Sequence, residues 1–195
     1  MDYSKFFKSI VLVMSTMVLV GCGSSGTSGV YSLKTSTDTE VISADSFDTE
    51  TGAVTEDTTI SVGDDKDTET KIEVSEGTQF TDENGDVITK APTAKVEVEK
   101  KQDESTTELD FSVDGKKVIP TEPITVSVQA PEGAKAGDEV EIEVPEGIKP
   151  ANMQKLILVI VNADGTVSIN IMPYVFRNHT VIAIIVKIKK DDSTN

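Results

Sequence analysis

The sequence predicts an all-β fold, an antiparallel β-sandwich, and two features of the residue pattern lead to this prediction. Apolar and polar residues alternate with a period of two, so that one face of each strand is buried and the other is wet. Turn-forming residues divide these runs at short intervals, and no long stretch has the 3.6-residue period of a helix. The alternating runs lie at 71–74, 96–98, 109–113, 124–128 and 140–144.

Two further runs, at 156–161 and 181–186, are continuously apolar and rich in β-branched residues. We expect them to be strands buried on both faces at the centre of the sandwich, because they are too short and too β-branched for helices. The segment between them, 166–171, alternates again. The block from 155 to 189 is therefore the strongest candidate for the core.

Turn signals and a near-repeat bear on how the strands are connected. The dipeptides Asp114-Gly115 and Asp164-Gly165 each stand between strand-like runs and predict hairpin turns. The sequence Ile-Glu-Val-Ser-Glu-Gly at 72–77 recurs as Ile-Glu-Val-Pro-Glu-Gly at 142–147. A duplicated domain and a chance repetition of strand-then-turn sequence both produce such a near-repeat. The prediction is therefore one sandwich, or two small ones.

Composition limits both the core and the partners. Hydrophobic residues make up 37% of the 195 residues and aromatics 5%, with no Trp, so Val and Ile must supply most of the core. The formal net charge of −16 predicts repulsion from phosphate backbones, which argues against a nucleic-acid partner. Anionic lipid head groups would also repel the body. Solubility is the simplest reason for this acidity, and calcium or a basic protein partner is compatible with it.

The first 22 residues have the layout of an export signal. Lys5 and Lys8 precede an apolar run at 10–20, and Gly21 and Cys22 follow it. This mostly apolar run of eleven residues is too short for a membrane-spanning helix. We therefore predict a signal peptide at 1–21 with cleavage between Gly21 and Cys22. Its removal deletes one acid and two lysines, which leaves the mature chain at −17.

The stretch Leu19-Val20-Gly21-Cys22 resembles the lipobox of bacterial lipoproteins. This resemblance implies that the Cys22 thiol takes a diacylglyceryl group, with palmitate-type chains, and that a dedicated peptidase then cuts before it. Two or more acyl chains give stable anchoring where one does not. Cys22 is also the only cysteine, so the chain can form no internal disulfide, and lipidation would protect a lone thiol from oxidation. The alternative is an ordinary secretory signal with a chance cysteine.

The residue after the cysteine bears on the destination of such a lipoprotein. It is Gly23 and not Asp, which resembles lipoproteins sorted to the outer membrane in a host with two membranes. In a host with one membrane this rule does not apply. The expected location is therefore the cell envelope, with the lipid anchor in the outer membrane if the host is Gram-negative.

Composition divides the mature chain into four segments. The lipidated cysteine and a flexible Gly/Ser tether occupy 22–29, with a reach on the order of 15 Å. The acidic, Thr-rich segment 30–70 is either a disordered stalk or part-ordered with strands around 39–43 and 58–62, and we take it as part-ordered. The β-sandwich module then occupies 71–190, and 191–195 is a disordered tail.

Short pieces of the body loosely resemble β-sandwich modules of bacterial surface lipoproteins, including ZU5-like and immunoglobulin-like ones. The resemblance covers about 70–190 and implies a role in structure or interaction, with no catalytic residues. The pieces that carry it are 74–78 with Asn84-Gly85, 123–128, 136–138 and 164–168.

Few residues suggest chemistry. His179 is the only histidine, and we expect it in a solvent-exposed turn before the last strand and not in a catalytic triad. Asp82, Asn84 and Asp86 offer oxygen ligands at alternate positions and form a weak calcium candidate, with a solvated turn as the alternative. The positions where an EF-hand needs Gly and Glu hold Val87 and Thr93, so this is no EF-hand.

Taken together, these features predict a membrane-anchored envelope lipoprotein with a non-catalytic structural or interaction β module. The alternative is a ligand-binding or assembly accessory subunit of a larger envelope complex. The expected partners are the membrane, through the lipid on Cys22, and a protein of the envelope; no cofactor beyond the covalent lipid is predicted. A long unpaired apolar edge strand would favour assembly, and a concave pocket with convergent polar groups would favour ligand binding.

Overall fold

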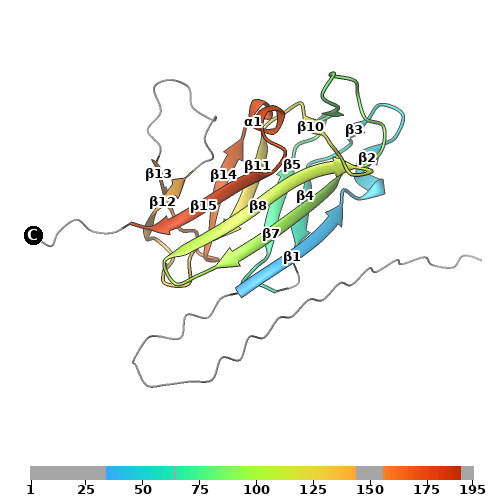
Figure 1. Cartoon of the computed structure of the whole chain (residues 1–195). Coiled ribbons are helices and arrows are strands. Elements are labelled where there is room, and N and C mark those ends of the chain that lie inside the picture. Colours follow the sequence, from blue (N-terminus) through green and yellow to red (C-terminus); the bar gives the residue numbers. More distant parts are fainter. Residues whose placement is uncertain (1–33, 64, 144–155, 190–195) are drawn as a thin grey trace, which may run out of the picture. The chain divides into compact units, whose positions relative to one another are not determined.

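The computed structural model describes residues 34–63, 65–143 and 156–189, which belong to one compact unit (Figure 1). Nearly all regular structure in these residues is antiparallel β-strand, which confirms the all-β sandwich prediction. The signal peptide, Gly21, Cys22, the tether, the second copy of the near-repeat beyond Glu143 and the tail lie outside the described residues.

The larger sheet has seven strands in the order β1-β7-β8-β15-β12-β13, with β9 paired to β8. Every pair in it is antiparallel. Its strands are β1 (Lys34–Val41), β7 (Thr93–Lys100), β8 (Glu104–Val113), β9 (Lys116–Lys117), β12 (Glu139–Glu143), β13 (Leu156–Ile160) and β15 (Ile182–Ile188).

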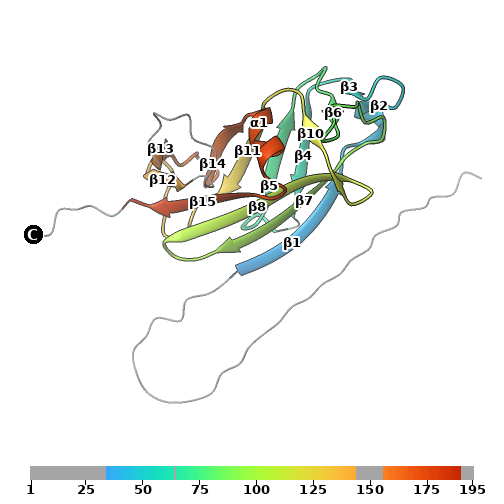
Figure 2. The same ribbon diagram turned by 45° about the horizontal axis from the view of Figure 1, so that its top comes forward.

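The smaller main sheet has four strands in the order β14-β11-β5-β4. These are β4 (Thr58–Val62), β5 (Thr70–Val74), β11 (Ile124–Gln129) and β14 (Thr166–Ile171). Two short pairs complete the strands: β2 (Phe47–Asp48) with β3 (Ala53–Val54), and β6 (Phe80–Thr81) with β10 (Ile119–Pro120). A 3-10 helix, η1 (Ala44–Ser46), precedes β2, and a short helix, α1 (Pro173–Asn178), lies beside β10 (Figure 2).

The alternating sequence pattern is visible in the burial of the strands. Along β7 every second residue is buried, and β8 shows the same alternation up to Phe111. The register Val96↔Leu109 places two buried side chains opposite each other across this pair. The period-two prediction is therefore confirmed for the central strands, with one face toward the core and one toward solvent.

The described strands share one hydrophobic core, in which residues of both main sheets form a single cluster. Val and Ile dominate it, as the scarcity of aromatics predicted. Three of the few aromatic rings pack against one another within it in a tilted arrangement: the Phe111 ring lies 5.6 Å from that of Phe80 and 5.7 Å from that of Phe176, measured between centroids. These rings join β8, β6 and α1, so they fix the helix end of the sandwich.

The prediction that both apolar runs would be buried on two faces is wrong. Strand β13 lies at the edge of the seven-stranded sheet, and its last residue, Ile160, is 54% exposed. Strand β15 does lie at the centre of that sheet, but its residues alternate between buried and half-buried. The physical reason is that the outer face of this sheet carries no second layer among the described elements, so only one face of each strand reaches the core.

One of the two predicted hairpins is confirmed. Asp114 and Gly115 both have positive φ, 51° and 76°, and join β8 to β9 as a two-residue turn. Gly165 also turns, with its N–H donating to the Asn162 carbonyl at 3.1 Å. The strands around this second turn belong to different sheets, however, because β13 pairs with β12 and β14 pairs with β11. The prediction of a hairpin at 164–165 is therefore wrong: the turn carries the chain from one layer to the other.

Both expected strand positions in the acidic, Thr-rich segment fall on or beside observed strands. Strand β4 occupies the expected residues and pairs with β5 of the smaller sheet. Strand β1 begins five residues before the expected 39–43 and pairs with β7 along its whole length. Threonine is abundant in both strands, which suits extended backbone. Strands β1 and β4, which precede position 70, thus belong to the same two main sheets as the strands that follow it.

A close backbone approach makes Gly52 a sensitive position. It connects β2 to β3 with φ of +69°, and a Cβ there would lie 2.4 Å from the Ile88 carbonyl oxygen and 2.6 Å from Val87 Cγ1. We expect Gly52→Ala to lower the free energy of unfolding by about 2–4 kcal/mol, from backbone strain and steric overlap together. Gly137 is the matched control, because it has φ of +89° with no atom within 4 Å of its Cβ position.

Urea unfolding of the chain without its first 22 residues measures the loss of free energy of unfolding in the Gly52→Ala and Gly137→Ala variants. Gly137→Ala should cost only the strain, about 1–2 kcal/mol. Equal losses in the two variants would show that the close approach at Gly52 is relieved without cost.

Candidate functional site

The outer face of the seven-stranded sheet is the most strongly charged surface formed by regular strands. Because strand residues alternate, the buried positions of β7, β8 and β12 leave every other side chain pointing outward. Most of these outward residues are acids. We call this surface the acidic face; its carboxylates are Glu97, Glu99, Glu104, Glu108, Asp110, Glu139, Glu141 and Glu143.

Lysines lie between these carboxylates and pair with them. Lys187 on β15 lies 2.7 Å from Glu143 and 3.6 Å from Glu104, so it bridges β12 and β8. Lys189 pairs with Glu139 at 2.6 Å. Since each of these side chains is about 30–45% exposed, each such pair contributes at most about 1 kcal/mol. Their main effect is to hold neighbouring strands in register while leaving the face acidic.

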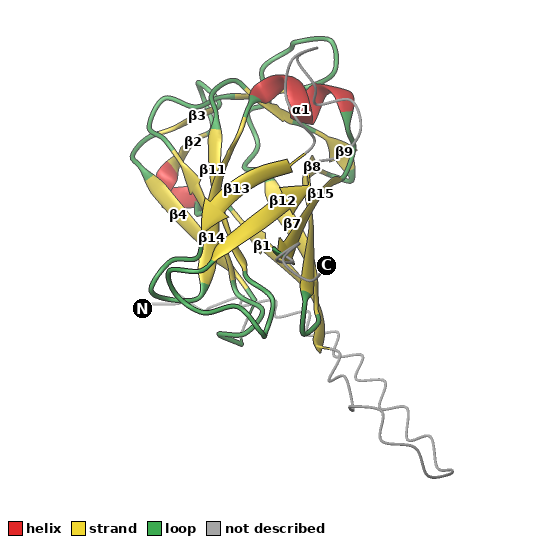
Figure 3. Cartoon of the chain, turned by 90° about the vertical axis from the view of Figure 1, so that its left-hand side faces the viewer, coloured by secondary structure: helices red, strands yellow, loops and turns green. Residues whose placement is uncertain are grey.

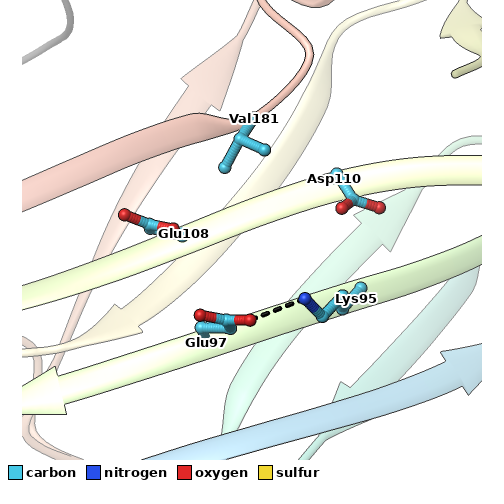
Figure 4. A pocket seen from close by; sticks show the side chains of 5 residues that line it. All are labelled: Lys95, Glu97, Glu108, Asp110 and Val181. Atoms are coloured by element: carbon cyan, nitrogen blue, oxygen red, sulfur yellow. Dashed lines mark hydrogen bonds and ion pairs between the residues drawn. The ribbon is translucent and has the colours of Figure 1, made fainter.

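A hollow on the acidic face lies over β7 and β8 and is lined by Lys95, Glu97, Glu108, Asp110 and Val181 (Figure 4). Lys95 donates a hydrogen bond of 2.6 Å to Glu97, and this bond raises the pKa of the Lys95 ammonium. Burial raises the pKa of the Asp110 carboxyl, and the nearby Lys95 opposes that rise. The hollow therefore contains one lysine, which is already hydrogen-bonded to Glu97, and three carboxylates. This arrangement resembles the solvated face of a strand more than a ligand pocket with convergent polar groups.

The raised pKa of Asp110 gives a pH-dependent expectation. A carboxyl whose folded pKa exceeds its ordinary value of 3.8 costs stability wherever it is ionised in the folded state. Asp110→Asn should therefore raise the free energy of unfolding at pH 7, by less than about 1 kcal/mol because the side chain is half-exposed. The gain should disappear as the pH falls below the ordinary carboxyl pKa of 3.8, because the carboxyl is then protonated in both the folded and the unfolded state.

Thermal unfolding between pH 3 and 7 tests this, with Glu108→Gln as the control on the same strand face. Glu108 is exposed, so its substitution removes the same charge without relieving a buried one. A gain of equal size in both variants would attribute the effect to net charge and not to the burial of Asp110.

The edge strand β13 is the second candidate surface. It pairs with β12 on one side, and the described strands leave its other side unpaired. Its sequence, Leu-Ile-Leu-Val-Ile, contains no polar residue. The other three edge strands of the two main sheets, β1, β4 and β14, all carry polar or charged residues. Natural edge strands commonly use such residues to prevent pairing with other chains, so β13 lacks a protection that the other edges have.

The carboxylate of Asp82 accepts hydrogen bonds from other residues of its own loop. Asp82 Oδ1 accepts hydrogen bonds from the backbone N–H groups of Asn84 and Asp86 at 2.8 and 2.9 Å, and Oδ2 accepts one from Asn84 Nδ2 at 3.2 Å. These bonds, the one from Asp86 above all, lower the pKa of Asp82. Among the described residues no group of three or more His, Cys, Asp or Glu is arranged to hold a metal ion. A cation here would have to compete with the loop's own donors, and the calcium site stays a prediction.

His179 does not lie in an exposed hairpin turn, and that expectation is wrong. It ends α1, where its backbone N–H donates to the Val175 carbonyl at 3.0 Å. Its side chain is half-buried, and the Nε2 atom is buried with no hydrogen-bond partner among the residues that the structure describes. The sequence could not indicate this, because α1 is a single short helix formed where Pro173 begins a turn.

The structure describes only some of the predicted site residues. Asp82, Asn84 and Asp86 come together in one loop, while Gly21 and Cys22 lie outside the described residues. Sequence reasoning missed the edge position of β13 and the pairing of lysines with the acidic face. A uniform apolar run next to an Asp-Gly turn was the available signal for β13, but it fits a central strand equally well.

Comparison with known proteins gives no match: no family model, no curated protein and no solved structure is significantly similar to this chain. In the ranges 34–63, 65–143 and 156–189, no helix is long and apolar enough to cross a membrane.

Proposed function

We propose that this chain is an envelope lipoprotein, anchored through acyl chains on Cys22, whose β-sandwich is a non-catalytic structural or interaction module. The observation that carries the proposal is the leader, in which two lysines, an apolar run, Gly21 and Cys22 follow each other in the order that lipidation requires. The fold supports it, because an antiparallel sandwich with a solvated acidic face suits an exported water-soluble body.

The lipid is tested directly on the mature protein. The full chain is produced in a bacterial host supplied with labelled palmitate, purified from membranes, and its first residue is identified by mass spectrometry. We expect an N-terminus at Cys22 that carries a diacylglyceryl mass and the label. An unmodified cysteine, or a mature chain that begins elsewhere, would refute the anchor.

The second candidate function is an accessory subunit that binds a larger envelope complex by strand addition. The observation that favours it is the apolar edge strand β13, whose outer backbone N–H and C=O groups pair with no other described strand and can extend the sheet with a strand from a partner protein. The acidic face offers less support, since three of its carboxylates, Glu104, Glu139 and Glu143, already pair with lysines of the same chain.

Ile160→Lys tests this second function. Ile160 is the exposed last residue of β13, and a charge there should block pairing of an incoming apolar strand. We expect in-cell crosslinks formed through β13 to decrease at least about tenfold, which corresponds to roughly 1.4 kcal/mol or more of lost binding. Val41→Lys is the control, because Val41 is also 54% exposed and ends the edge strand at the other side of the same sheet.

Both variants should unfold at the temperature of the parent chain, since neither residue is buried. Loss of the same crosslinks in both variants, or in neither, would contradict strand addition at β13.

A further inference from the structure

The two ends of the sandwich are distinguished by where the chain enters. The described fold begins at Lys34, the first residue of β1, which pairs with Lys100 at the end of β7. We call this end the anchor pole. Its loops are joined by backbone hydrogen bonds: Gly133 donates to Gln102, Ile188 to Asp103, and Ala130 to Gly165. The anchor pole is made of Lys34 and residues 63–71, 100–104, 130–139, 161–165 and 187–189, Asp64 excepted.

The opposite end, which we call the helix pole, contains α1, η1 and the short strand pairs; α1, β2 and β3 are labelled in Figure 3. Strand β1 runs from one pole to the other over eight residues, or roughly 25 Å. Lys117 ties this pole together, because it donates to the Arg177 carbonyl at 3.2 Å and lies 3.1 Å from Glu83. The helix pole is made of residues 40–57, 75–92, 114–123 and 172–181.

Charge is divided unequally between the two poles. The anchor pole holds nine acids and seven lysines with described side chains, so it is nearly neutral, whereas the helix pole holds twelve acids against three lysines and Arg177. These anchor-pole lysines are 66, 71, 100, 101, 135, 187 and 189. Adding the five charged residues at 34, 64 and 190–192, which belong to or adjoin the anchor pole in sequence, would bring it only to −3, against −8 at the helix pole.

Ion pairs support this balance at the anchor pole. Lys101 lies 3.0 Å from Glu99 and 3.8 Å from Glu104, and Lys71 lies 3.9 Å from Asp164. The helix pole also has ion pairs, Lys117 with Glu83 and Lys90 with Asp114. Its other carboxylates include Asp48, which accepts hydrogen bonds from neutral donors, the Glu50 N–H and the Thr51 hydroxyl, and these leave the negative charge in place.

We propose that the anchor pole is the surface that faces an anionic bilayer, because its lipid head groups repel this pole less than they repel the helix pole, which is presented away from the membrane. This inference rests on the proposed lipid anchor at Cys22. Residues 23–33 join that anchor to Lys34 and can span at most roughly 40 Å, which would still allow the body to tip over. The charge difference selects one orientation, because an anionic surface repels the helix pole far more strongly than the anchor pole.

The test uses the lipidated full chain on vesicles. Cys22 is the only cysteine, so once it is lipidated an introduced cysteine is the sole free thiol. Ala136→Cys places a fluorescent donor at the anchor pole and Asn178→Cys places one at the helix pole, both at exposed positions. Energy transfer to a labelled head group is then measured on neutral phosphatidylcholine vesicles and on vesicles that also contain phosphatidylglycerol.

On anionic vesicles we expect transfer from position 136 to exceed transfer from position 178 by at least about twofold, given the roughly 25 Å between the poles. The ratio should fall on neutral vesicles, and on anionic vesicles in 1 M salt, where the Debye length shrinks to about 3 Å. A ratio near one on anionic vesicles, or one that is indifferent to lipid charge and salt, would overturn the orientation.

A matched pair of charge variants separates the poles. Lys66→Glu with Lys135→Glu makes the anchor pole more negative by four charges, and Lys90→Glu with Lys116→Glu does the same at the helix pole, all at exposed positions. Only the first pair should lower the ratio on anionic vesicles; equal effects would overturn the proposal. A chain that fails to float with the vesicles would instead refute the lipid anchor, so the two failures are distinguishable.

Discussion

Replacing Phe111 by Ala should lower the free energy of unfolding by about 3–5 kcal/mol, which is the usual cost of removing a buried aromatic ring. Phe111 is 1% exposed and contacts the rings of both Phe80 and Phe176. Its loss leaves a cavity where β8, β6 and α1 meet, and the core has few other aromatic rings to fill it. A typical domain is stable by only 5–15 kcal/mol, so this one substitution removes a large share.

Urea unfolding of the chain without residues 1–22 measures the loss. Phe111→Leu should cost clearly less, because it retains most of the apolar volume. Tyr174→Ala is the second control: this aromatic lies on the same short helix as Phe176 but is 44% exposed, and its removal should change stability by about 0.5 kcal/mol or less. Similar losses for Phe111 and Tyr174 would show that the ring cluster does not hold the helix pole together.

Replacing Cys22 by Ala should move the protein from the membrane fraction to the aqueous fraction almost completely. Burial of an acyl chain contributes about 0.8 kcal/mol per CH₂, so two chains of about 14 CH₂ groups hold the body by roughly 20 kcal/mol. Cleavage between Gly21 and Cys22 should stop as well, because the implied peptidase acts on the lipidated cysteine. Flotation of cell extracts, together with the mass of the chain, measures both effects.

Gly23→Asp is the control for this experiment. It alters the neighbouring residue and keeps the thiol, so the chain should stay in the membrane fraction; in a host with two membranes it should favour the inner one. An alanine variant that remains membrane-bound would mean that another part of the chain holds the body to the bilayer.

The fold class could be predicted from the sequence, because the alternation of apolar and polar residues is a local property. In the structure the apolar residues of β7, and those of β8 up to Phe111, are buried. Runs such as 124–128 became strands whose apolar residues enter the core. Strand order could not be predicted in the same way, since it depends on contacts between distant residues. The apolar run at 156–161 has the composition of a central strand yet forms an edge, because β15 and not β13 fills the place between β8 and β12.

The candidate surfaces were predictable only in part. The spacing of Asp82, Asn84 and Asp86 was enough to locate their loop. It could not predict that backbone N–H groups of the same loop donate hydrogen bonds to the Asp82 carboxylate. The division of charge between the poles could not be read from the sequence at all. It arises because Lys66, Lys101 and Lys187, far apart along the chain, come to the same end of the sandwich when the strands pair.

The position of β15 has a consequence for the order in which the molecule is built. It is the last described strand along the chain, yet it lies between β8 and β12 and joins the two halves of the larger sheet. Until residue 188 has left the ribosome, the described strands β8 and β12 have no common neighbour. The larger sheet therefore closes only after both of its halves have been synthesised.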